Sequence, residues 1–168
     1  FNCDHGLYIN GQQRPAINGD WFDVLSPLDE QPLARVASAS ENDVAEAVVV
    51  AAKGLALWSA LPPKDREAVL LKAAQIMEAE GEARYLELLI RESGSSITKA
   101  RFEISYTVDL LRTAAGEVRR LYGDTFPNDR PDRMSMVFRE PLGVVAVVSP
   151  YNAPLALLCK MAAFPLAA

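Results

Sequence analysis

The chain has 168 residues, of which 50% are hydrophobic and 23% charged, a composition that fits a globular protein and excludes collagen-like, low-complexity and disulfide-scaffold classes. Its net charge of -5 argues against a nucleic-acid partner. The two cysteines, Cys3 and Cys159, stand near opposite ends without a CxxC or His-rich neighbourhood. We therefore expect no disulfide framework, no metal site and a reducing, cytoplasmic setting.

Two terminal segments bear on localisation. Residues 1–6 lack the basic and then apolar layout of a signal peptide and contain no initiator Met, so we expect a trimmed chain that is not secreted. Residues 141–168 carry a single charge, Lys160, and are long enough to cross a bilayer. The prolines and the Asn at 149–154 interrupt this run, so we expect a buried strand, a turn and a buried helix rather than a membrane span.

Residues 1–40 predict a small antiparallel β arm. Apolar residues 7–9 lead into the hairpin-type dipeptide Asn10-Gly11, and further extended stretches follow at 21–25 and 33–36.

Residues 41–123 predict a cluster of helices. Ser40 and Asp43 have the spacing of a capping box, so the first helix begins there and ends before the two prolines at 62–63. A second helix is expected from Lys64 to the glycine at 94, weakened at Gly81.

A third, long helix is expected from about residue 98 to residue 122, ended by the glycine at 123. Its apolar positions are spaced 4, 3, 4, 3 and 4, which places one stripe against a partner helix or sheet. The stripe consists of Ile104, Val108, Leu111, Ala115, Val118 and Tyr122. We interpret it as core packing.

Residues 124–140 change in character and mark the best internal boundary. A turn-rich stretch at 126–132 precedes a predicted strand at 134–139, whose unpaired edges we expect to pair with another strand or subunit. Residues 141–168 predict a strand at 144–148, a turn and a helix, which is half of a βαβ unit. The fold class is therefore α/β, and we expect the chain to stop in mid-domain.

The chemistry-bearing residues are few. The sequence contains no GxGxxG, GxxxxGK[ST], GxSxG or HExxH motif. His5 is expected on the surface or in a fraying tail, and the acidic residues on solvated helix faces. Cys159 adjoins Lys160, which would lower the thiol pKa if both faced one cleft. Because helix neighbours point about 100° apart, a buried structural cysteine is favoured over a nucleophile.

Asn152 directly follows the predicted strand, where open parallel sheets bind ligands. Its side-chain amide is a neutral donor flanked by Pro150 and Pro154, which suits it to stabilising an oxyanion. The alternative is an Asn that caps the following helix or forms an Asx turn. From the residues alone both readings stay open.

The stretch 139–155, R-E-P-L-G-V-V-A-V-V-S-P-Y-N-A-P-L, resembles the E-P-L-G-V-V-x-x-I-x-P-W/F-N-x-P segment of NAD(P)-dependent aldehyde dehydrogenases. Residues 26–36 resemble that family's N-P-x-T-G-E hairpin, and 58–59 its helix-ending W-S. Residues 91–94 resemble its E-T-G-K, and 115–116 the A-G of its long helix. The similarity covers essentially the whole chain.

The resemblance implies the N-terminal part of an aldehyde dehydrogenase-like fold: a β arm and a helical cluster leading into the first strand and helix of a Rossmann-like NAD(P)-binding unit. It implies that Asn152 helps form the oxyanion hole and that residues 134–140 belong to the oligomerisation arm of a dimer or tetramer. Four residues would line the nicotinamide and ribose part of the cofactor cleft, namely Val148, Ser149, Pro150 and Tyr151.

The resemblance also implies an oxidoreductase that converts an aldehyde to a carboxylic acid with NAD or NADP. The family's catalytic Cys and general-base Glu would lie beyond Ala168, so the chain alone is expected to be inactive. Tyr151 replaces the commoner Trp or Phe, and Ala153 the commoner Phe. Ala153 in this place resembles the branch acting on aromatic aldehydes, such as vanillin or salicylaldehyde dehydrogenases. The alternative is a non-catalytic assembly or interaction module.

Overall fold

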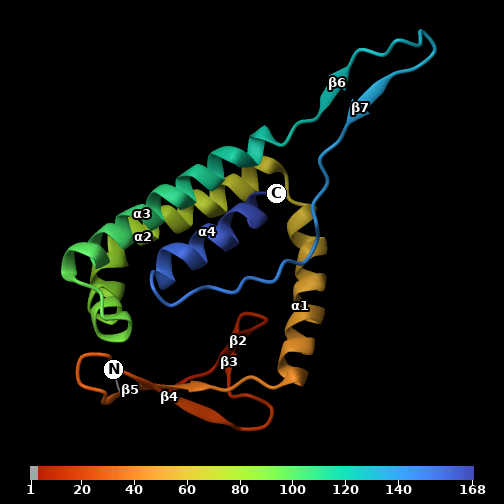
Figure 1. The fold of residues 1–168 in the computed structure, drawn as a ribbon. Helices are drawn as coiled ribbons and strands as arrows, with labels where there is room; N and C mark the ends of the chain where they lie inside the picture. Colours follow the sequence, from red (N-terminus) through yellow and green to blue (C-terminus); the bar gives the residue numbers. More distant parts are fainter. Residues whose placement is uncertain (1–3) are drawn as a thin grey trace.

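The computed structural model describes residues 4–168, so the expectation for Cys3 lies outside the described residues. A β arm forms one end of the molecule, and helix α1 runs from it toward a layer of three helices (Figure 1). A hairpin projects from the other end of these helices.

The predicted hairpin of the β arm is confirmed. Strands β2 (Leu7–Ile9) and β3 (Gln12–Arg14) pair antiparallel. Asn10 and Gly11 between them both have positive φ, 54° and 75°. This conformation favours Asn-Gly, since it matches the twist of the two strands it joins.

The second sheet of the arm has the order β1-β5-β4. Strand β4 (Trp21–Leu25) pairs antiparallel with β5 (Pro32–Ala37), as the sequence predicts. Strand β1 (Asp4–His5) is added parallel to β5 on its other edge. His5 is exposed as expected, but it lies on a paired strand rather than in a fraying tail.

Helix α1 (Glu41–Ser59) begins with the predicted capping box. The Ser40 hydroxyl accepts a hydrogen bond from the Asp43 amide, and the Asp43 carboxylate accepts one from the Ser40 amide at 2.9 Å. The same carboxylate, only 1% exposed, accepts from the Ile17 amide at 3.1 Å. Asp43 therefore attaches the β arm to the helix, and the hydrogen bonds from Ser40 lower its pKa.

Helices α2 (Pro63–Ser93) and α3 (Ile97–Glu117) form the main helical pair. Helix α2 ends at Gly94, whose φ of 67° is the left-handed conformation that glycine adopts readily. A short 3-10 turn, η1 (Val118–Arg120), extends α3. The apolar stripe of α3 is buried as predicted except at Tyr122, which is exposed because the helical backbone ends before it.

The predicted weakening of α2 at Gly81 is wrong. The helix is continuous through this position, and Gly81 is buried against α3. A Cβ atom there would lie 2.9 Å from both Ile104 Cγ2 and Met77 Sδ. The glycine lets the two helix backbones approach each other and does not interrupt the helix.

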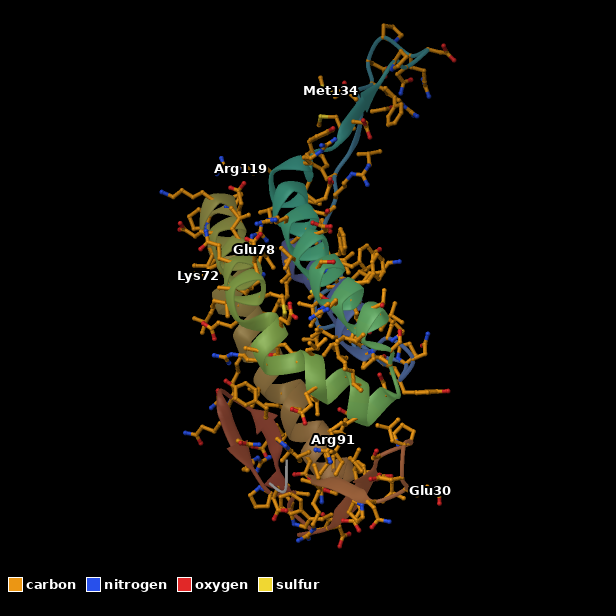
Figure 2. All side chains as sticks on the ribbon, turned by 90° about the vertical axis from the view of Figure 1, so that its left-hand side faces the viewer. Glu30, Lys72, Glu78, Arg91, Arg119 and Met134 are labelled. Atoms are coloured by element: carbon orange, nitrogen blue, oxygen red, sulfur yellow. The ribbon has the colours of Figure 1, made fainter. Side chains whose placement is uncertain are left out.

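The projecting hairpin contains β6 (Asp124–Phe126) and β7 (Ser135–Val137), which pair antiparallel. Strand β7 lies within the predicted strand, but its partner β6 falls partly in the segment read as turn-rich. The side chain of Met134 lies out on this hairpin, away from the charged side chains on the helices (Figure 2). Pairing of the remaining edge with another subunit stays a prediction.

The predicted strand at 144–148 is wrong for this structure, because a strand requires a neighbour to take its backbone hydrogen bonds and none of the described residues pairs with it. Helix α4 (Pro154–Ala167) follows as predicted and packs against α3 and α2. The Trp58 indole N–H donates to the Leu166 carbonyl at 2.8 Å. Within residues 4–168 no single helix is long and apolar enough to span a membrane; only α1 and α2 pass that test jointly, bent by 117°.

Candidate active site

The five residues predicted to form the site lie together in one loop that leads into α4. Val148 and Tyr151 are 87% and 82% exposed, so two largely apolar side chains three positions apart stand open to solvent. Pro150 and Asn152 are also exposed, and Ser149 is half-buried. The structure therefore presents this loop on the surface of the chain rather than in its core.

Two kinds of constraint hold the loop. The Ser149 hydroxyl donates to the Pro154 carbonyl at 3.4 Å, across the turn that contains Asn152. Pro150 and Pro154 each fix one backbone φ angle near -65°. The loop is thus short and restrained although its side chains are exposed.

The amide N–H groups at the start of α4 are capped by a residue from another helix. Glu103 on α3 accepts hydrogen bonds through Oε1 from the Leu155 amide at 2.9 Å and the Ala156 amide at 3.2 Å. The residue at the cap position, Ala153, contributes no side-chain bond. The alternative role of Asn152 as a helix cap is therefore taken by Glu103.

Within the part of the chain that the structure describes, the Asn152 amide makes no hydrogen bond of its own. It is exposed and lies within a loop that two prolines restrain. A side-chain amide in this state can donate to a ligand oxygen without first breaking a contact within the protein.

Glu103 is the site residue that sequence reasoning missed. Its side chain is 2% exposed, whereas the acidic residues were expected on solvated helix faces. Lys99, four residues earlier, forms an ion pair with Glu103 Oε2 at 3.1 Å. An (i, i+4) Lys–Glu pair is visible in the sequence, but the same spacing is typical of exposed helix faces, so the pattern alone does not reveal burial.

Cys159 has the features of a structural cysteine. It is half-buried in α4 and packs against the core cluster shared by α2, α3 and α4. Burial raises the pKa of its thiol, which is the opposite of what a nucleophilic thiolate needs. Lys160 beside it is exposed, so the two do not share a cleft.

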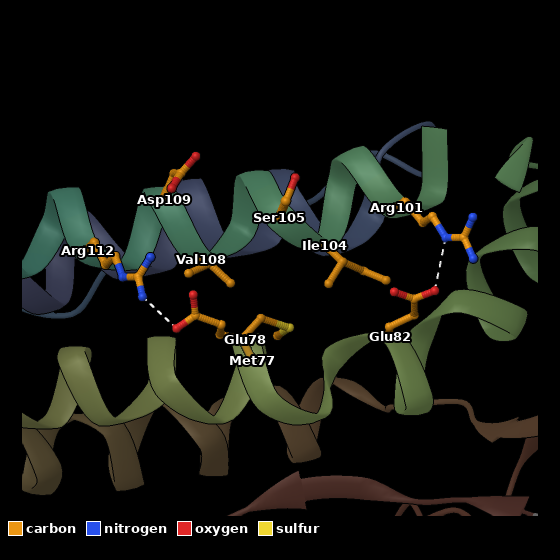
Figure 3. Close-up of a pocket in the computed structure, with 9 residues that line it drawn as sticks. All are labelled: Met77, Glu78, Glu82, Arg101, Ile104, Ser105, Val108, Asp109 and Arg112. Atoms are coloured by element: carbon orange, nitrogen blue, oxygen red, sulfur yellow. Dashed lines mark hydrogen bonds and ion pairs between the residues drawn. The ribbon is translucent and has the colours of Figure 1, made fainter. Parts of the chain in front are cut away.

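A groove between α2 and α3 has a volume of about 280 Å³ and lies apart from this loop (Figure 3). Ion pairs cross it between Arg101 and Glu82 at 2.9 Å and between Arg112 and Glu78 at 2.6 Å. Four of the five charged side chains that line it are thus paired with one another. None of the predicted site residues lines it.

The sequence profile of the Aldehyde dehydrogenase family matches residues 15–168. The chain belongs to the aldehyde dehydrogenase family. The match covers the helices and the loop before α4, in agreement with the resemblance seen in the sequence.

Two curated relatives show the range of the family around this chain. It is 33% identical over 161 residues to glutarate-semialdehyde dehydrogenase of Pseudomonas putida. The alignment covers 96% of this chain and 33% of the relative. It is 34% identical over 164 residues to vanillin dehydrogenase of Pseudomonas fluorescens, and this alignment covers 98% of this chain and 34% of the relative. The chain thus spans about a third of the length of these relatives.

Solved structures confirm the fold. A salicylaldehyde dehydrogenase of Pseudomonas putida in complex with salicylaldehyde matches with a TM-score of 0.92 and 26% identity, over 99% of this chain and 34% of the other. An NAD-dependent benzaldehyde dehydrogenase of Corynebacterium glutamicum matches with a TM-score of 0.87 and 33% identity, over 97% of this chain and 35% of the other. An NADP-dependent glyceraldehyde-3-phosphate dehydrogenase of Bacillus halodurans in complex with NADP matches with a TM-score of 0.83 and 29% identity, over 95% of this chain and 34% of the other.

Proposed function

We propose that this chain supplies the oxyanion donor and part of the cofactor-facing surface of an NAD(P)-dependent aldehyde dehydrogenase, which oxidises an aldehyde to a carboxylic acid. The observation that carries the proposal is the Asn152 amide, exposed and without a hydrogen-bond partner among residues 4–168, in the restrained loop before α4. Membership of the family supports the reaction class. We propose a cytoplasmic enzyme.

In this reaction a nucleophile attacks the aldehyde carbon, and the electron pair of the C=O bond moves to oxygen. Asn152 would donate an N–H group to that oxygen as its negative charge develops. A donor oriented before reaction stabilises the transition state without reorganising, which makes such groups effective. We propose that the nucleophile is the family's catalytic Cys and that it lies outside residues 1–168; Cys159, half-buried with a raised pKa, lacks the features of a nucleophile.

The residues before Asn152 fit the nicotinamide end of the cofactor. Val148 and Tyr151 offer exposed apolar surface against which a flat ring can lie, and Ser149 adds a hydroxyl beside them. We propose that Val148, Ser149, Pro150 and Tyr151 contact this part of NAD or NADP. The dinucleotide supplies a hydride acceptor when bound.

We propose an aromatic aldehyde as the substrate. Ala153, next to Asn152, adds no side-chain bulk beyond Cβ, which leaves room for a ring near the oxyanion donor. The similarity to a vanillin dehydrogenase supports this choice, although a glutarate-semialdehyde dehydrogenase is about equally similar. Turnover of an aromatic aldehyde and an aliphatic semialdehyde by the full-length gene product would separate the two classes.

The test of the proposed role is Asn152→Ala in the full-length gene product. Loss of an oxyanion donor should lower kcat on the order of 10² to 10³, about 3 to 4 kcal/mol. Because the structure gives the amide no internal hydrogen bond, the thermal midpoint should stay near that of the parent. Single-turnover hydride transfer at saturating cofactor measures the chemical step directly. Normal hydride transfer in this variant would refute the oxyanion role.

A further inference from the structure

Glu103 is a buried carboxylate that takes no direct part in the proposed reaction. With 2% exposure, it and Asp43 are the buried acidic side chains among residues 4–168. A charge in such a place is costly unless paired and hydrogen-bonded. Both of its oxygens are occupied, one by two backbone amides of α4 and the other by Lys99.

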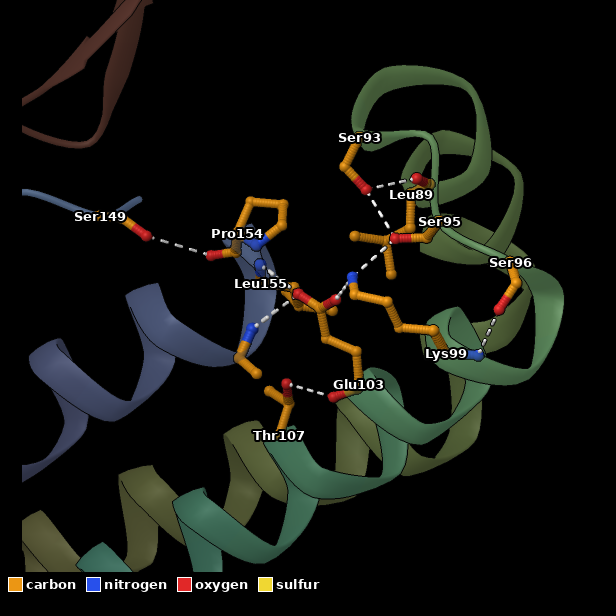
Figure 4. Close-up of polar contacts among 11 residues, drawn as sticks. Leu89, Ser93, Ser95, Ser96, Lys99, Glu103, Thr107, Ser149, Pro154 and Leu155 are labelled. Atoms are coloured by element: carbon orange, nitrogen blue, oxygen red, sulfur yellow. Dashed lines mark hydrogen bonds and ion pairs between the residues drawn. The ribbon is translucent and has the colours of Figure 1, made fainter. Parts of the chain in front are cut away.

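The contacts of Glu103 belong to a chain of polar contacts that joins three helix ends (Figure 4). The Lys99 ammonium also donates to the Ser95 hydroxyl at 2.7 Å. Ser95 contacts the Ser93 hydroxyl at 2.7 Å, and Ser93 donates to the Leu89 carbonyl at 2.7 Å in the last turns of α2. The end of α2, the start of α3 and the start of α4 are thus held in one arrangement.

The geometry gives Glu103 two effects on α4. Its oxygen satisfies two of the amide groups that a helix start leaves without partners. Its negative charge lies at the end of the helix where the backbone dipole is positive, which strengthens both bonds. Leu155, the first residue bound, is only three positions after Asn152, so fixing the first turn of α4 also fixes the exit of the loop.

We propose that Glu103 is a positioning residue for Asn152: by holding the first turn of α4 on α3, it sets where the Asn152 amide lies relative to the substrate oxygen. This inference rests on the proposed role of Asn152. Besides Ser149, Glu103 is the only described side chain that hydrogen-bonds the start of α4 or the loop before it. A displacement of about 1 Å in a reacting group can cost up to about 100-fold in rate, so an anchor at this place affects kcat.

The test is a double-mutant cycle in the full-length gene product. Glu103→Gln keeps the size of the side chain and an oxygen that can accept from α4, but removes the charge and the pairing with Lys99. We expect kcat for hydride transfer to fall by about 10- to 100-fold. If Glu103 acts through Asn152, Glu103→Gln should cause no further loss of kcat in the Asn152→Ala background. Equal fold losses in both backgrounds would overturn the inference.

A second variant covers the case in which Glu103→Gln does not fold. Lys99 is 42% exposed, so Lys99→Gln removes the charge that pairs with Glu103 Oε2 and disturbs less packing than a change at Glu103 itself. We expect a smaller loss of kcat, again absent in the Asn152→Ala background. The positioning role is overturned if kcat is unchanged in both Lys99→Gln and a folded Glu103→Gln. If Glu103→Gln does not fold, unchanged kcat in Lys99→Gln alone overturns it.

Leu111→Ala is the control for general destabilisation, because Leu111 lies in the core cluster and outside the polar contacts. It should lower the thermal midpoint and leave kcat at 25 °C unchanged. The two proposals fail differently. Normal kcat in Asn152→Ala defeats the oxyanion role itself, whereas slow Asn152→Ala with normal Glu103→Gln defeats only the positioning role.

Discussion

Gly81 gives the most direct test of how α2 and α3 pack. Replacing it with Ala brings two opposing terms. In a helix interior Ala is favoured over Gly by about 1 kcal/mol. Against this, the new Cβ would lie 2.9 Å from Ile104 Cγ2 and from Met77 Sδ, closer than carbon or sulfur tolerates. Overpacking of a core position costs about 1 to 3 kcal/mol.

The two contacts differ in how easily they yield. Both side chains line the groove between α2 and α3 (Figure 3), but Met77 is unbranched and flexible, so its sulfur can move aside. Ile104 is β-branched and 7% exposed, so its Cγ2 cannot leave without shifting a helix. We therefore take a cost of about 2 kcal/mol for the overpacking. With the propensity gain of about 1 kcal/mol, the net loss of unfolding free energy is about 1 kcal/mol.

Gly54→Ala on α1 is the matched control, because its Cβ would meet nothing within 4 Å. This variant should gain about 1 kcal/mol of unfolding free energy, so the two variants should differ by about 2 kcal/mol. Urea denaturation, with the slope compared between variants, measures both values. If Gly81→Ala is stabilised as much as Gly54→Ala, a Cβ at residue 81 meets no steric obstacle, and α2 does not pack closely against α3 at this position.

Two further predictions concern stability and assembly. Asp43 has a lowered pKa in the folded chain, so its contribution to the free energy of unfolding is present above pH 3.8, its ordinary pKa, and is lost as the pH falls below that value. Acid unfolding curves should show this loss of stability in the parent and a smaller loss in Asp43→Asn. Phe138 is 73% exposed just past β7, so Phe138→Lys should shift sedimentation toward smaller species if the outer edge of the hairpin joins subunits; an unchanged distribution would remove that assignment.

Features that depend on residues close in sequence were predicted correctly. The capping box of Ser40 and Asp43 and the Asn10-Gly11 turn each depend on residues no more than three positions apart. The starts of the first three helices and the ends of the first two followed from apolar spacing and from proline and glycine positions, but the third helix and its 3-10 turn end at Arg120, before the predicted residue 122. The loop around Asn152 was located from a motif that is continuous in sequence, and its role as a site stays a prediction.

Features that depend on distant residues were not predictable. Residues 144–148 have strand-forming side chains, but a strand also needs a neighbour, and the described residues supply none. Gly81 was read as a weak point because its contact with Ile104 lies on another helix. Glu103 was expected in solvent because its partners Leu155 and Ala156 are more than 50 residues away.

The bond between Glu103 and Leu155 closes a loop of 52 residues that includes the whole projecting hairpin. The entropy of closing a loop grows only with the logarithm of its length, so even doubling the length costs about 0.6 kcal/mol. Insertions or deletions at the hairpin tip therefore leave the docking of α4 on α3 almost unaffected. Evolution can change the length and sequence of the projecting arm without disturbing the loop that carries Asn152.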